Sequence, residues 1–275
     1  MAQGPRRAAH VSWQLSLIMP AYDEAAGIEQ AVAEAHAALC DLDYEFEIIV
    51  VDDGSSDTTA ARVADAAGAL PTVRLIRHVR NLGYGAALRS GFDAARFDRV
   101  AFTDADGQFF LEDLDHLLPL TVEYPIVAGY RVNRQDPWRR RFLSRGYNWV
   151  VRNLLGTRVR DCDCALKVFR REVLEYLMPE TNGFFVNAEM LCKASRLGIP
   201  VAEVAVRHRP RRHGASKVSL LDIPRTFRKL VPFWWSQVVW GARPEPIFLP
   251  DPELPVEVRG SEEPSYSLRR PIQPR

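Results

Sequence analysis

The stretch that decides the fold is Val100-Ala101-Phe102-Thr103-Asp104-Ala105-Asp106-Gly107-Gln108, an apolar run that ends in two aspartates. Alternate residues of an extended chain point to the same side, so Asp104 and Asp106 can bind one divalent cation through carboxylate oxygens. A lone Asp-x-Asp pair is weak evidence, because most such pairs are solvated turns. Motifs elsewhere in the chain decide between a cation site and a turn.

Two other apolar runs end in the same way. Residues 15–19 lead into Pro20-Ala21-Tyr22-Asp23-Glu24, and residues 46–50 lead into Val51-Asp52-Asp53-Gly54-Ser55. In an open α/β sheet, ligands bind beyond the carboxyl ends of the strands, where all three motifs would lie. The sequence therefore predicts a site for a metal ion and a nucleotide, with Tyr22, Glu24 and either Asp52 or Asp53 at the base and ribose.

Strand and helix patterns alternate along the chain, which predicts an α/β fold with a mainly parallel central sheet and flanking helices. The expected strands are 15–19, 45–51, 73–77, 99–103, 125–129 and 199–206. The expected helices are 27–39, 58–67, 84–95, 111–118, 139–155 and 186–197, with Asp57 as the N-terminal cap of the second. We expect a disordered segment at 1–12, one catalytic domain at 13–219, an amphipathic helix at 220–241 and a Pro-rich flexible tail at 242–275.

Charge and cysteine content exclude some classes of function and location. The 36 Lys and Arg residues nearly balance 35 Asp and Glu residues, so the net charge of +1 gives no general attraction to nucleic acid. Nine arginines and a single carboxylate, Asp136, occupy residues 131–160, and guanidinium groups suit two-point binding of phosphate. Four cysteines without zinc or disulfide spacing, no signal peptide and no apolar run of membrane-spanning length predict a protein on the cytosolic side.

Aromatic and basic residues recur at helical spacing near the end of the chain, around Trp234 and Trp235. A helix of this kind, too short to cross a bilayer, suits the membrane interface. A terminal helix packed on the core, or a dimer contact, is the alternative.

Five motifs stand in the order in which one known family has them. They are Pro20-Ala21-Tyr22-Asp23-Glu24, Val51-Asp52-Asp53-Gly54-Ser55, Asn81-Leu82-Gly83-Tyr84-Gly85, Asp104-Ala105-Asp106-Gly107-Gln108 and Arg211-Arg212-His213-Gly214-Ala215-Ser216-Lys217. The chain thereby resembles the family 2 glycosyltransferases of the A-type fold, and among them the polyprenyl-phosphate, dolichol-phosphate-mannose synthase-like branch. It departs from many relatives in lacking a glycine before Lys167.

The resemblance implies a Rossmann-like nucleotide-diphospho-sugar transferase domain. It implies inverting, metal-dependent transfer of a hexose from GDP-mannose or UDP-glucose to polyprenyl phosphate, by a peripheral enzyme on the inner face of the cytoplasmic membrane with a possible integral membrane partner protein. A Mg or Mn ion would be held by Asp104, Asp106 and Gln108. A phosphate acceptor is largely ionised at neutral pH and can attack without a strong protein base.

The resemblance also distributes roles over single residues. At the donor nucleotide it places Pro20, Tyr22, Glu24, Asp52, Asp53, Gly83 and Gly85, with Asp52 favoured over Asp53 for the base. At the acceptor phosphate it places Arg131, Arg145, Arg211 and Lys217, with Arg145 catalytic beside Asp104 and Asp106. Glu189 would contact the sugar or an arginine, or lie on a helix surface, and Asp161 would hold the sugar or orient basic residues. Gly83 and Gly85 would either cradle phosphate or form a tight turn into a helix.

Two other functions compete with this assignment. Transfer to a hydroxyl group of a glycan or glycolipid would need a carboxylate base, for which Asp161 and Asp163 are the candidates. A nucleotide-sugar-binding module without catalysis is the second alternative. Nucleic-acid binding is disfavoured, because no recognisable module accompanies the arginines and the acidic motif would repel a polyanion.

Overall fold

The computed structural model describes residues 13–42, 44–132, 138–157, 159–212, 230–236, 240 and 245–247, with side chains in the helix that starts at Trp138 described from residue 145. The expectations for residues 1–12, for Lys217 and for most of 242–275 lie outside the described residues.

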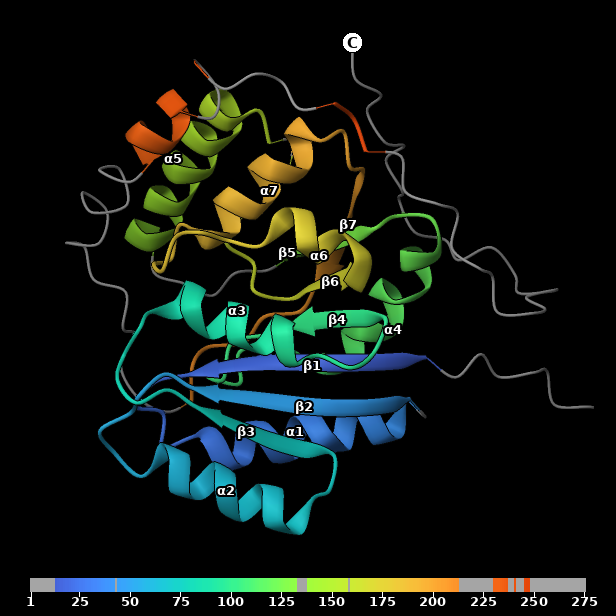
Figure 1. Cartoon of the computed structure of the whole chain (residues 1–275), viewed down its shortest axis with the longest axis vertical. Coiled ribbons are helices and arrows are strands. Elements are labelled where there is room, and N and C mark those ends of the chain that lie inside the picture. Colours follow the sequence, from blue (N-terminus) through green and yellow to red (C-terminus); the bar gives the residue numbers. More distant parts are fainter. Residues whose placement is uncertain are drawn as a thin grey trace, which may run out of the picture.

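A seven-stranded sheet runs through the molecule in the order β3-β2-β1-β4-β6-β5-β7 (Figure 1). Its strands are β1 (Gln14–Ala21), β2 (Glu45–Asp52), β3 (Val73–Arg77), β4 (Arg99–Phe102), β5 (Ile126–Arg131), β6 (Lys167–Arg170) and β7 (Val201–Val206). Neighbouring strands are parallel except that β6 runs antiparallel to both β4 and β5. The prediction of a mainly parallel sheet is therefore confirmed.

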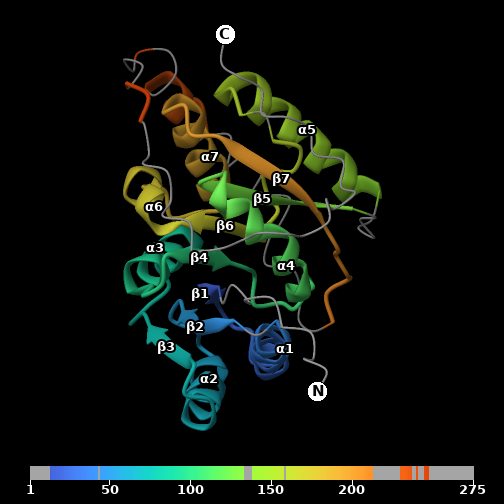
Figure 2. The same cartoon turned by 90° about the vertical axis from the view of Figure 1, so that its right-hand side faces the viewer.

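Helices follow most of the strands. They are α1 (Ile28–Asp41), α2 (Thr59–Ala69), α3 (Tyr84–Ala94), α4 (Leu114–Leu117), α5 (Trp138–Leu155), α6 (Arg171–Leu177) and α7 (Val186–Arg196). Figure 2 shows α3 and α6 on one side of the strands and α1 and α4 on the other. The expected single helix at 111–118 is instead split into 3₁₀ turns at Leu111–Asp113 and Pro119–Val122 on either side of α4.

The central strands are buried on both faces, as expected for parallel strands covered by helices. In β2, Ile48, Ile49, Val50 and Val51 are all fully buried. Pro20 lies inside β1 rather than after it, opposite Val51 of β2. The pairing of β1 with β4 stops at Ile18, so the missing N–H of Pro20 falls where there is no ladder partner on that side.

The sequence prediction missed β6 and α6. Residues 167–170 read Lys-Val-Phe-Arg, and two charged residues in four hide a strand that is buried throughout. Backbone carbonyls make this burial tolerable: Lys167 Nζ donates to the oxygen of Cys162 at 3.0 Å, and Arg170 Nε donates to the oxygen of Thr121 at 2.8 Å. The partner of Arg170 lies 49 positions away and leaves no local signal, whereas that of Lys167 lies in the loop just before β6.

A second apolar cluster joins α5, α7 and residues 230–236. Leu230 is fully buried in it, and the ring of Phe233 meets Phe185 edge-on at 5.2 Å between centroids. Trp235, in contrast, is 52% exposed. The described part of the expected amphipathic helix thus packs on the core by one face and presents an aromatic residue on the other.

Candidate donor and metal site

Three polar loops meet at the carboxyl ends of adjacent strands, as the sequence predicts. Asp104 and Asp106 follow β4, Tyr22 and Glu24 follow β1, and Asp53 follows β2. These strands stand in the order β2-β1-β4, so their carboxylates gather at one edge of the sheet.

Asp104 and Asp106 are both held by hydrogen bonds from neighbouring residues. The hydroxyl group of Tyr84 donates to Oδ1 of Asp104 at 2.9 Å, and the backbone N–H of Gln108 donates to Oδ1 of Asp106 at 3.1 Å. Burial raises the pKa of Asp104, and burial together with the charge of Asp104 raises the pKa of Asp106 to about 7. Two crowded carboxylates of this kind are stabilised by a nearby positive charge.

A positive charge from the protein stands beside them. Nη1 of Arg211 lies 3.9 Å from Oδ2 of Asp106, and Nη2 of Arg211 donates to Oε1 of Glu24. The oxygen donors of the two aspartates also fit Mg²⁺ or Mn²⁺. Across the described parts of the chain, no three His, Cys, Asp or Glu side chains form a metal cluster. An ion bound through one or two carboxylates and completed by substrate phosphates needs no more than this pair.

Gln108 has a structural contact that the sequence did not indicate. Its Nε2 donates to the carbonyl oxygen of Arg209 at 3.0 Å, and its own carbonyl oxygen accepts the N–H of Arg209 at 2.9 Å. Gln108 thus joins the metal loop to residues 207–212, and its assignment as a metal ligand stays a prediction.

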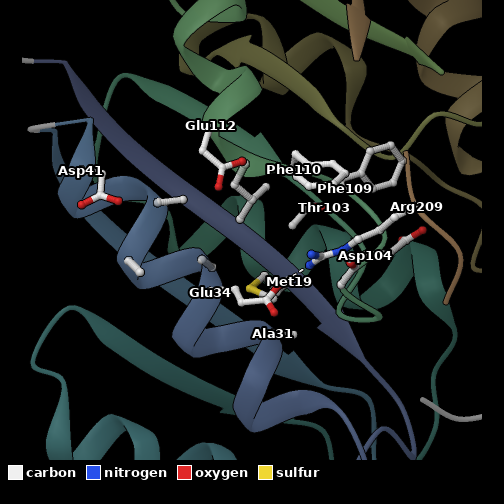
Figure 3. A pocket seen from close by; sticks show the side chains of 15 residues that line it. Met19, Ala31, Glu34, Asp41, Thr103, Asp104, Phe109, Phe110, Glu112 and Arg209 are labelled. Atoms are coloured by element: carbon white, nitrogen blue, oxygen red, sulfur yellow. Dashed lines mark hydrogen bonds and ion pairs between the residues drawn. The ribbon is translucent and has the colours of Figure 1, made fainter. Parts of the chain in front are cut away.

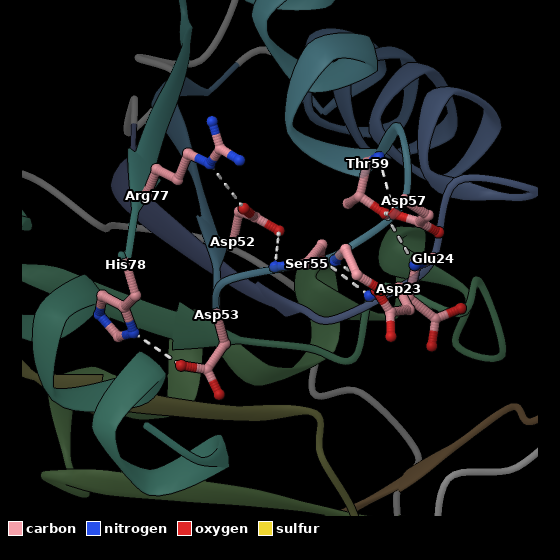
Figure 4. A network of polar contacts seen from close by, with 10 residues as sticks. Asp23, Glu24, Asp52, Asp53, Ser55, Asp57, Thr59, Arg77 and His78 are labelled. Carbon is pink, nitrogen blue, oxygen red and sulfur yellow. Dashed lines mark hydrogen bonds and ion pairs between the residues drawn. The ribbon is translucent and has the colours of Figure 1, made fainter. Parts of the chain in front are cut away.

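The two adjacent aspartates at the end of β2 have separate environments (Figure 4). Oδ1 of Asp53 accepts hydrogen bonds from Nδ1 of His78 at 2.7 Å and from the N–H of Leu82 at 2.9 Å. Oδ2 of Asp53 accepts the N–H of Gly83 at 2.8 Å. Asp53 therefore fixes the loop before α3, and this use of both oxygens argues against its expected role at the base.

Asp52 retains an oxygen without a hydrogen bond. Its Oδ1 accepts the N–H of Ser55 at 3.3 Å, whereas its buried Oδ2 has no hydrogen-bond donor and lies 3.5 Å from Nε of Arg77. An unsatisfied buried acceptor is costly unless a partner arrives. Of the two aspartates, Asp52 is the one with a lone pair to offer to a ligand.

Tyr22 and Glu24 lie on a loop that is pinned to the end of β2. Asp23 between them has a φ of 48°, and its N–H donates to Oγ of Ser55 at 2.8 Å. The expected cap, Asp57, accepts the N–H groups of Thr59 at 2.9 Å and Ala25 at 3.1 Å, so it binds this loop as well as the start of α2.

Gly83 and Gly85 serve close packing. A Cβ atom would lie 2.3 Å from the oxygen of Asn182 at Gly83 and 2.0 Å from the oxygen of Thr181 at Gly85. The N–H of Gly83 is used by Asp53, and the N–H of Gly85 donates to Asn182 at 3.0 Å. Of the two expected roles, the structure thus supports the tight turn. The phosphate cradle is wrong, because the N–H groups of both glycines are already used within the protein.

Glu189 is fully buried, so the surface alternative is wrong. Its oxygens accept the N–H of Glu180 at 2.6 Å and both the N–H and the hydroxyl group of Thr181, at 3.0 and 2.6 Å. Burial alone would raise the pKa of Glu189, but these donors outweigh it and hold the pKa below its ordinary value. Instead of a sugar or an arginine, Glu189 holds the segment that packs on Gly83 and Gly85.

Arg131 and Arg145, expected at the acceptor phosphate, differ in surroundings. Nε and Nη2 of Arg131 donate to the two oxygens of Asp161 at 2.7 and 2.8 Å, and the charge of Arg131 opposes part of the rise in the pKa of Asp104 that burial causes. Asp161 therefore orients a basic residue, which is one of the two roles expected for it. Arg145 is exposed on α5.

Residues 207–212, called the basic strap below, lie along the loop that follows the metal motif. Nε of Arg207 donates to Asp113 at 2.7 Å, and Arg209 donates to Glu34 of α1 and to the oxygen of Gly107. Figure 3 shows the Glu34–Arg209 pair beside a cavity of about 220 Å³ between α1 and residues 103–112. Arg211, expected at the acceptor, lies in this strap on the side of Glu24 and Asp106.

Comparison with known proteins agrees with this arrangement. The family model for "Glycosyl transferase family 2" matches residues 16–178, which span the strand ends that carry the three acidic motifs. The chain belongs to glycosyl transferase family 2.

Two proteins with related sequences have a polyprenyl phosphate in their names. The undecaprenyl-phosphate 4-deoxy-4-formamido-L-arabinose transferase of Pseudomonas fluorescens (strain SBW25) is 34% identical over 221 residues, covering 76% of this chain and 61% of that protein. The dodecaprenyl-phosphate galacturonate synthase of Rhizobium johnstonii is 31% identical over 227 residues, covering 80% and 65%. The chain thus spans less than two thirds of the length of either relative.

A solved structure of a sugar-transferring enzyme has a similar fold. Glucosyl-3-phosphoglycerate synthase from Mycobacterium tuberculosis, in complex with Mn²⁺, UDP and glucosyl-3-phosphoglycerate, aligns with a TM-score of 0.62 at 26% identity, covering 81% of this chain and 79% of that one. The predicted fold class is therefore confirmed.

Two residues of this family 2 site were missed in the sequence. Tyr84 stacks on Phe184 at 5.7 Å between centroids while its hydroxyl group holds Asp104. His78 connects Asp53 to Oγ of Ser90 at 2.9 Å. Tyr84 stands inside a quoted motif, where a hydroxyl-bearing residue between two glycines was the available signal, whereas His78 had none.

Proposed function

We propose that the chain transfers a sugar from a nucleotide-diphosphate donor to the phosphate group of a polyprenyl phosphate. The observation that carries the proposal is the pairing of opposite charges at the strand ends. The Asp104–Asp106 pair suits a cation, and Arg131 is set in place by Asp161. Burial raises the pKa of Asp104, and the positive charge of Arg131 opposes part of that rise. The names of two related proteins, a transferase to undecaprenyl phosphate and a dodecaprenyl-phosphate synthase, support the same acceptor class.

Each residue has a definite part in this proposal. Asp104 and Asp106 hold a Mg or Mn ion, which when bound neutralises charge that develops on the leaving diphosphate. Tyr84 keeps Asp104 in position. Tyr22, 37% exposed at the end of β1, stacks on the base, and Asp52 accepts a hydrogen bond from it. The acceptor phosphate attacks the anomeric carbon from the side opposite the diphosphate, so the configuration inverts.

Arg131 has donors to spare for the acceptor. Asp161 takes one N–H from Nε and one from Nη2, and a guanidinium group carries five N–H donors in a fixed fork. The remaining N–H donors of Arg131 are available to a phosphate, and Asp161 has already fixed the orientation of the side chain that carries them. Pre-orientation of this kind lowers the entropy lost when a phosphate is bound.

The same contacts weigh against a hydroxyl acceptor. Such an acceptor needs a carboxylate base, and Asp161 is bound at both oxygens by Arg131. Asp163, half-buried near Tyr84 and Tyr147, remains the candidate base for that alternative.

Donor choice can be tested with a panel. UDP in the Mycobacterium structure supports UDP-glucose over GDP-mannose, while the two relatives named above imply UDP-linked galacturonate and formamidoarabinose as further candidates. We expect one of these four donors to be consumed, with Mn²⁺ present, much faster when undecaprenyl phosphate is added than by slow hydrolysis without the lipid. Equal consumption without the lipid would indicate a hydrolase, and binding without consumption would indicate a non-catalytic module.

The lipid acceptor implies work at a membrane surface, on its inner face. Within the described residues, no helix has the length and apolarity needed to span a bilayer. Trp149 on α5 is 63% exposed and Trp235 is 52% exposed. Arg145 and Arg152 flank Trp149 on α5, all three exposed one or two turns apart, which suits contact with anionic lipid. An integral membrane protein as an additional partner is part of the same proposal.

Replacing Trp149 and Trp235 together by serine is expected to weaken binding to anionic vesicles by about tenfold or more, since each large apolar side chain gains about 1.5 to 3 kcal/mol on burial. The apparent KM for long polyprenyl phosphates should rise, while short soluble analogues are little affected. Vesicle sedimentation measures the first effect. Tyr176→Ser, which removes an exposed aromatic ring on α6, is the matched control. Unchanged sedimentation of the folded double variant would favour the dimer-contact alternative.

A further inference from the structure

The basic strap is held down by carboxylates at several points. Arg207 binds Asp113, while Arg209 and Arg212 both bind Glu34, Arg212 through Nη1 at 2.7 Å. A β-bridge between Phe109 and His208 adds a backbone link to the metal loop. One arginine of the strap contacts both Glu24 and Asp106.

That arginine is Arg211. It donates to Glu24 through Nη2, and its Nη1 lies 3.9 Å from Asp106. The side chains of all three residues are largely buried, at 17%, 13% and 11% exposure. The guanidinium group therefore supplies positive charge to the carboxylates that face the nucleotide and the metal in the proposed function.

We propose that Arg211 stands in for the metal ion before the donor binds, and that it exchanges Glu24 and Asp106 for the donor diphosphate when the nucleotide sugar arrives. This inference rests on the proposed function. Two positive charges repel strongly when they share one partly buried carboxylate, so Arg211 weakens metal binding to the free protein. A diphosphate offers the guanidinium group charge-assisted hydrogen bonds of its own and so relieves the competition.

Arg211 thereby couples the metal to the nucleotide. Coupling between two ligands is reciprocal, and its usual size is about 5- to 150-fold in affinity. The consequence is ordered loading: metal is retained when a diphosphate is present and released with it. This role places Arg211 on the donor side of the reaction and removes it from the expected acceptor set.

The test measures Mn²⁺ affinity of the full chain without any turnover, from the loss of the free-ion electron paramagnetic resonance signal. Arg211→Gln and Arg211→Met, two neutral side chains of different shape, are both expected to raise Mn²⁺ affinity about tenfold in the absence of nucleotide. Arg212→Gln is the matched control, because it removes a strap arginine that binds Glu34 but not Glu24 or Asp106. Its Mn²⁺ affinity should equal that of the unaltered protein.

The second part of the test repeats the Mn²⁺ titration with UDP present. UDP should raise Mn²⁺ affinity more in the unaltered protein than in Arg211→Gln, by the same factor of about ten that separates them without nucleotide. Unchanged or weaker Mn²⁺ binding by both folded Arg211 variants would overturn the inference, and so would an equal gain in Arg212→Gln. Asp106→Asn distinguishes failure of the Arg211 inference from failure of the proposed function. Mn²⁺ binding unaffected by that change would overturn the metal site itself.

Discussion

Asp106→Asn is expected to lower sugar transfer about a thousandfold, which corresponds to about 4 kcal/mol of transition-state stabilisation. One carboxylate charge is lost where a cation must offset the charge developing on the leaving diphosphate. Steady-state transfer with saturating Mn²⁺ measures the effect.

The same change should leave the fold intact. Burial and the charge of Asp104 raise the pKa of Asp106 to about 7. The folded protein therefore disfavours the ionised form of this carboxylate. An amide of the same size removes this unfavourable charge, and the melting temperature should stay the same or rise. Asp115→Asn, the same substitution at an exposed position of α4, is the matched control and should leave transfer unchanged. Full activity of folded Asp106→Asn would remove the metal role.

Arg131→Lys is expected to reduce acceptor-dependent transfer about tenfold to a hundredfold. A lysine keeps the positive charge but cannot reproduce the planar two-point contact with Asp161 or with a phosphate. Loss of one charge-assisted hydrogen bond costs about 1.5 to 3 kcal/mol, which gives this range. Acceptor-independent hydrolysis of the donor, followed in the same samples, should change little.

Arg145→Lys, measured beside Arg131→Lys, shows whether one or both arginines contact the acceptor phosphate. Arg145 is exposed on α5, whereas the side chain of Arg131 is 12% exposed and fixed. If both arginines contact the acceptor phosphate, both variants lose transfer and keep hydrolysis. Equal loss of transfer and hydrolysis would move the residue to the donor side, and no loss of either would leave Arg145 a surface residue.

The sequence predicted the elements whose signal is local. β1, β2 and β4 are apolar runs that end in acidic residues, and the three loops meet where parallel strands require them to meet. Asp104 and Asp106 are close because they are one residue apart, although Ala105 and Asp106 form a turn where the sequence argument assumed extended backbone. These features need no knowledge of which distant segments pack together.

Most of the missed features depend on partners far along the chain. β6 is hidden by Lys167 and Arg170; the charge of Arg170 is accommodated by the carbonyl group of Thr121, 49 positions away, and that of Lys167 by Cys162 in the preceding loop. Glu189 reads as a helix residue, but its role is fixed by residues 180–181 and, through them, by packing on Gly83 and Gly85. The choice between Asp52 and Asp53 depends on side-chain partners that strand register decides. The contact of Arg211 with Glu24 spans 187 positions, so no local pattern indicates it.

The central claim is that the acceptor is a phosphate, and one measurement tests it directly. The protein, Mn²⁺ and the donor found active in the panel are incubated with undecaprenyl phosphate or with undecaprenol, and labelled lipid product is counted. The account predicts product from the phosphate, with its sugar released by mild acid, and none from the alcohol, because Arg131 can bind the phosphate while no free carboxylate base is needed. Product from undecaprenol at a comparable rate would contradict it and would make Asp163 the candidate base of a hydroxyl-directed enzyme.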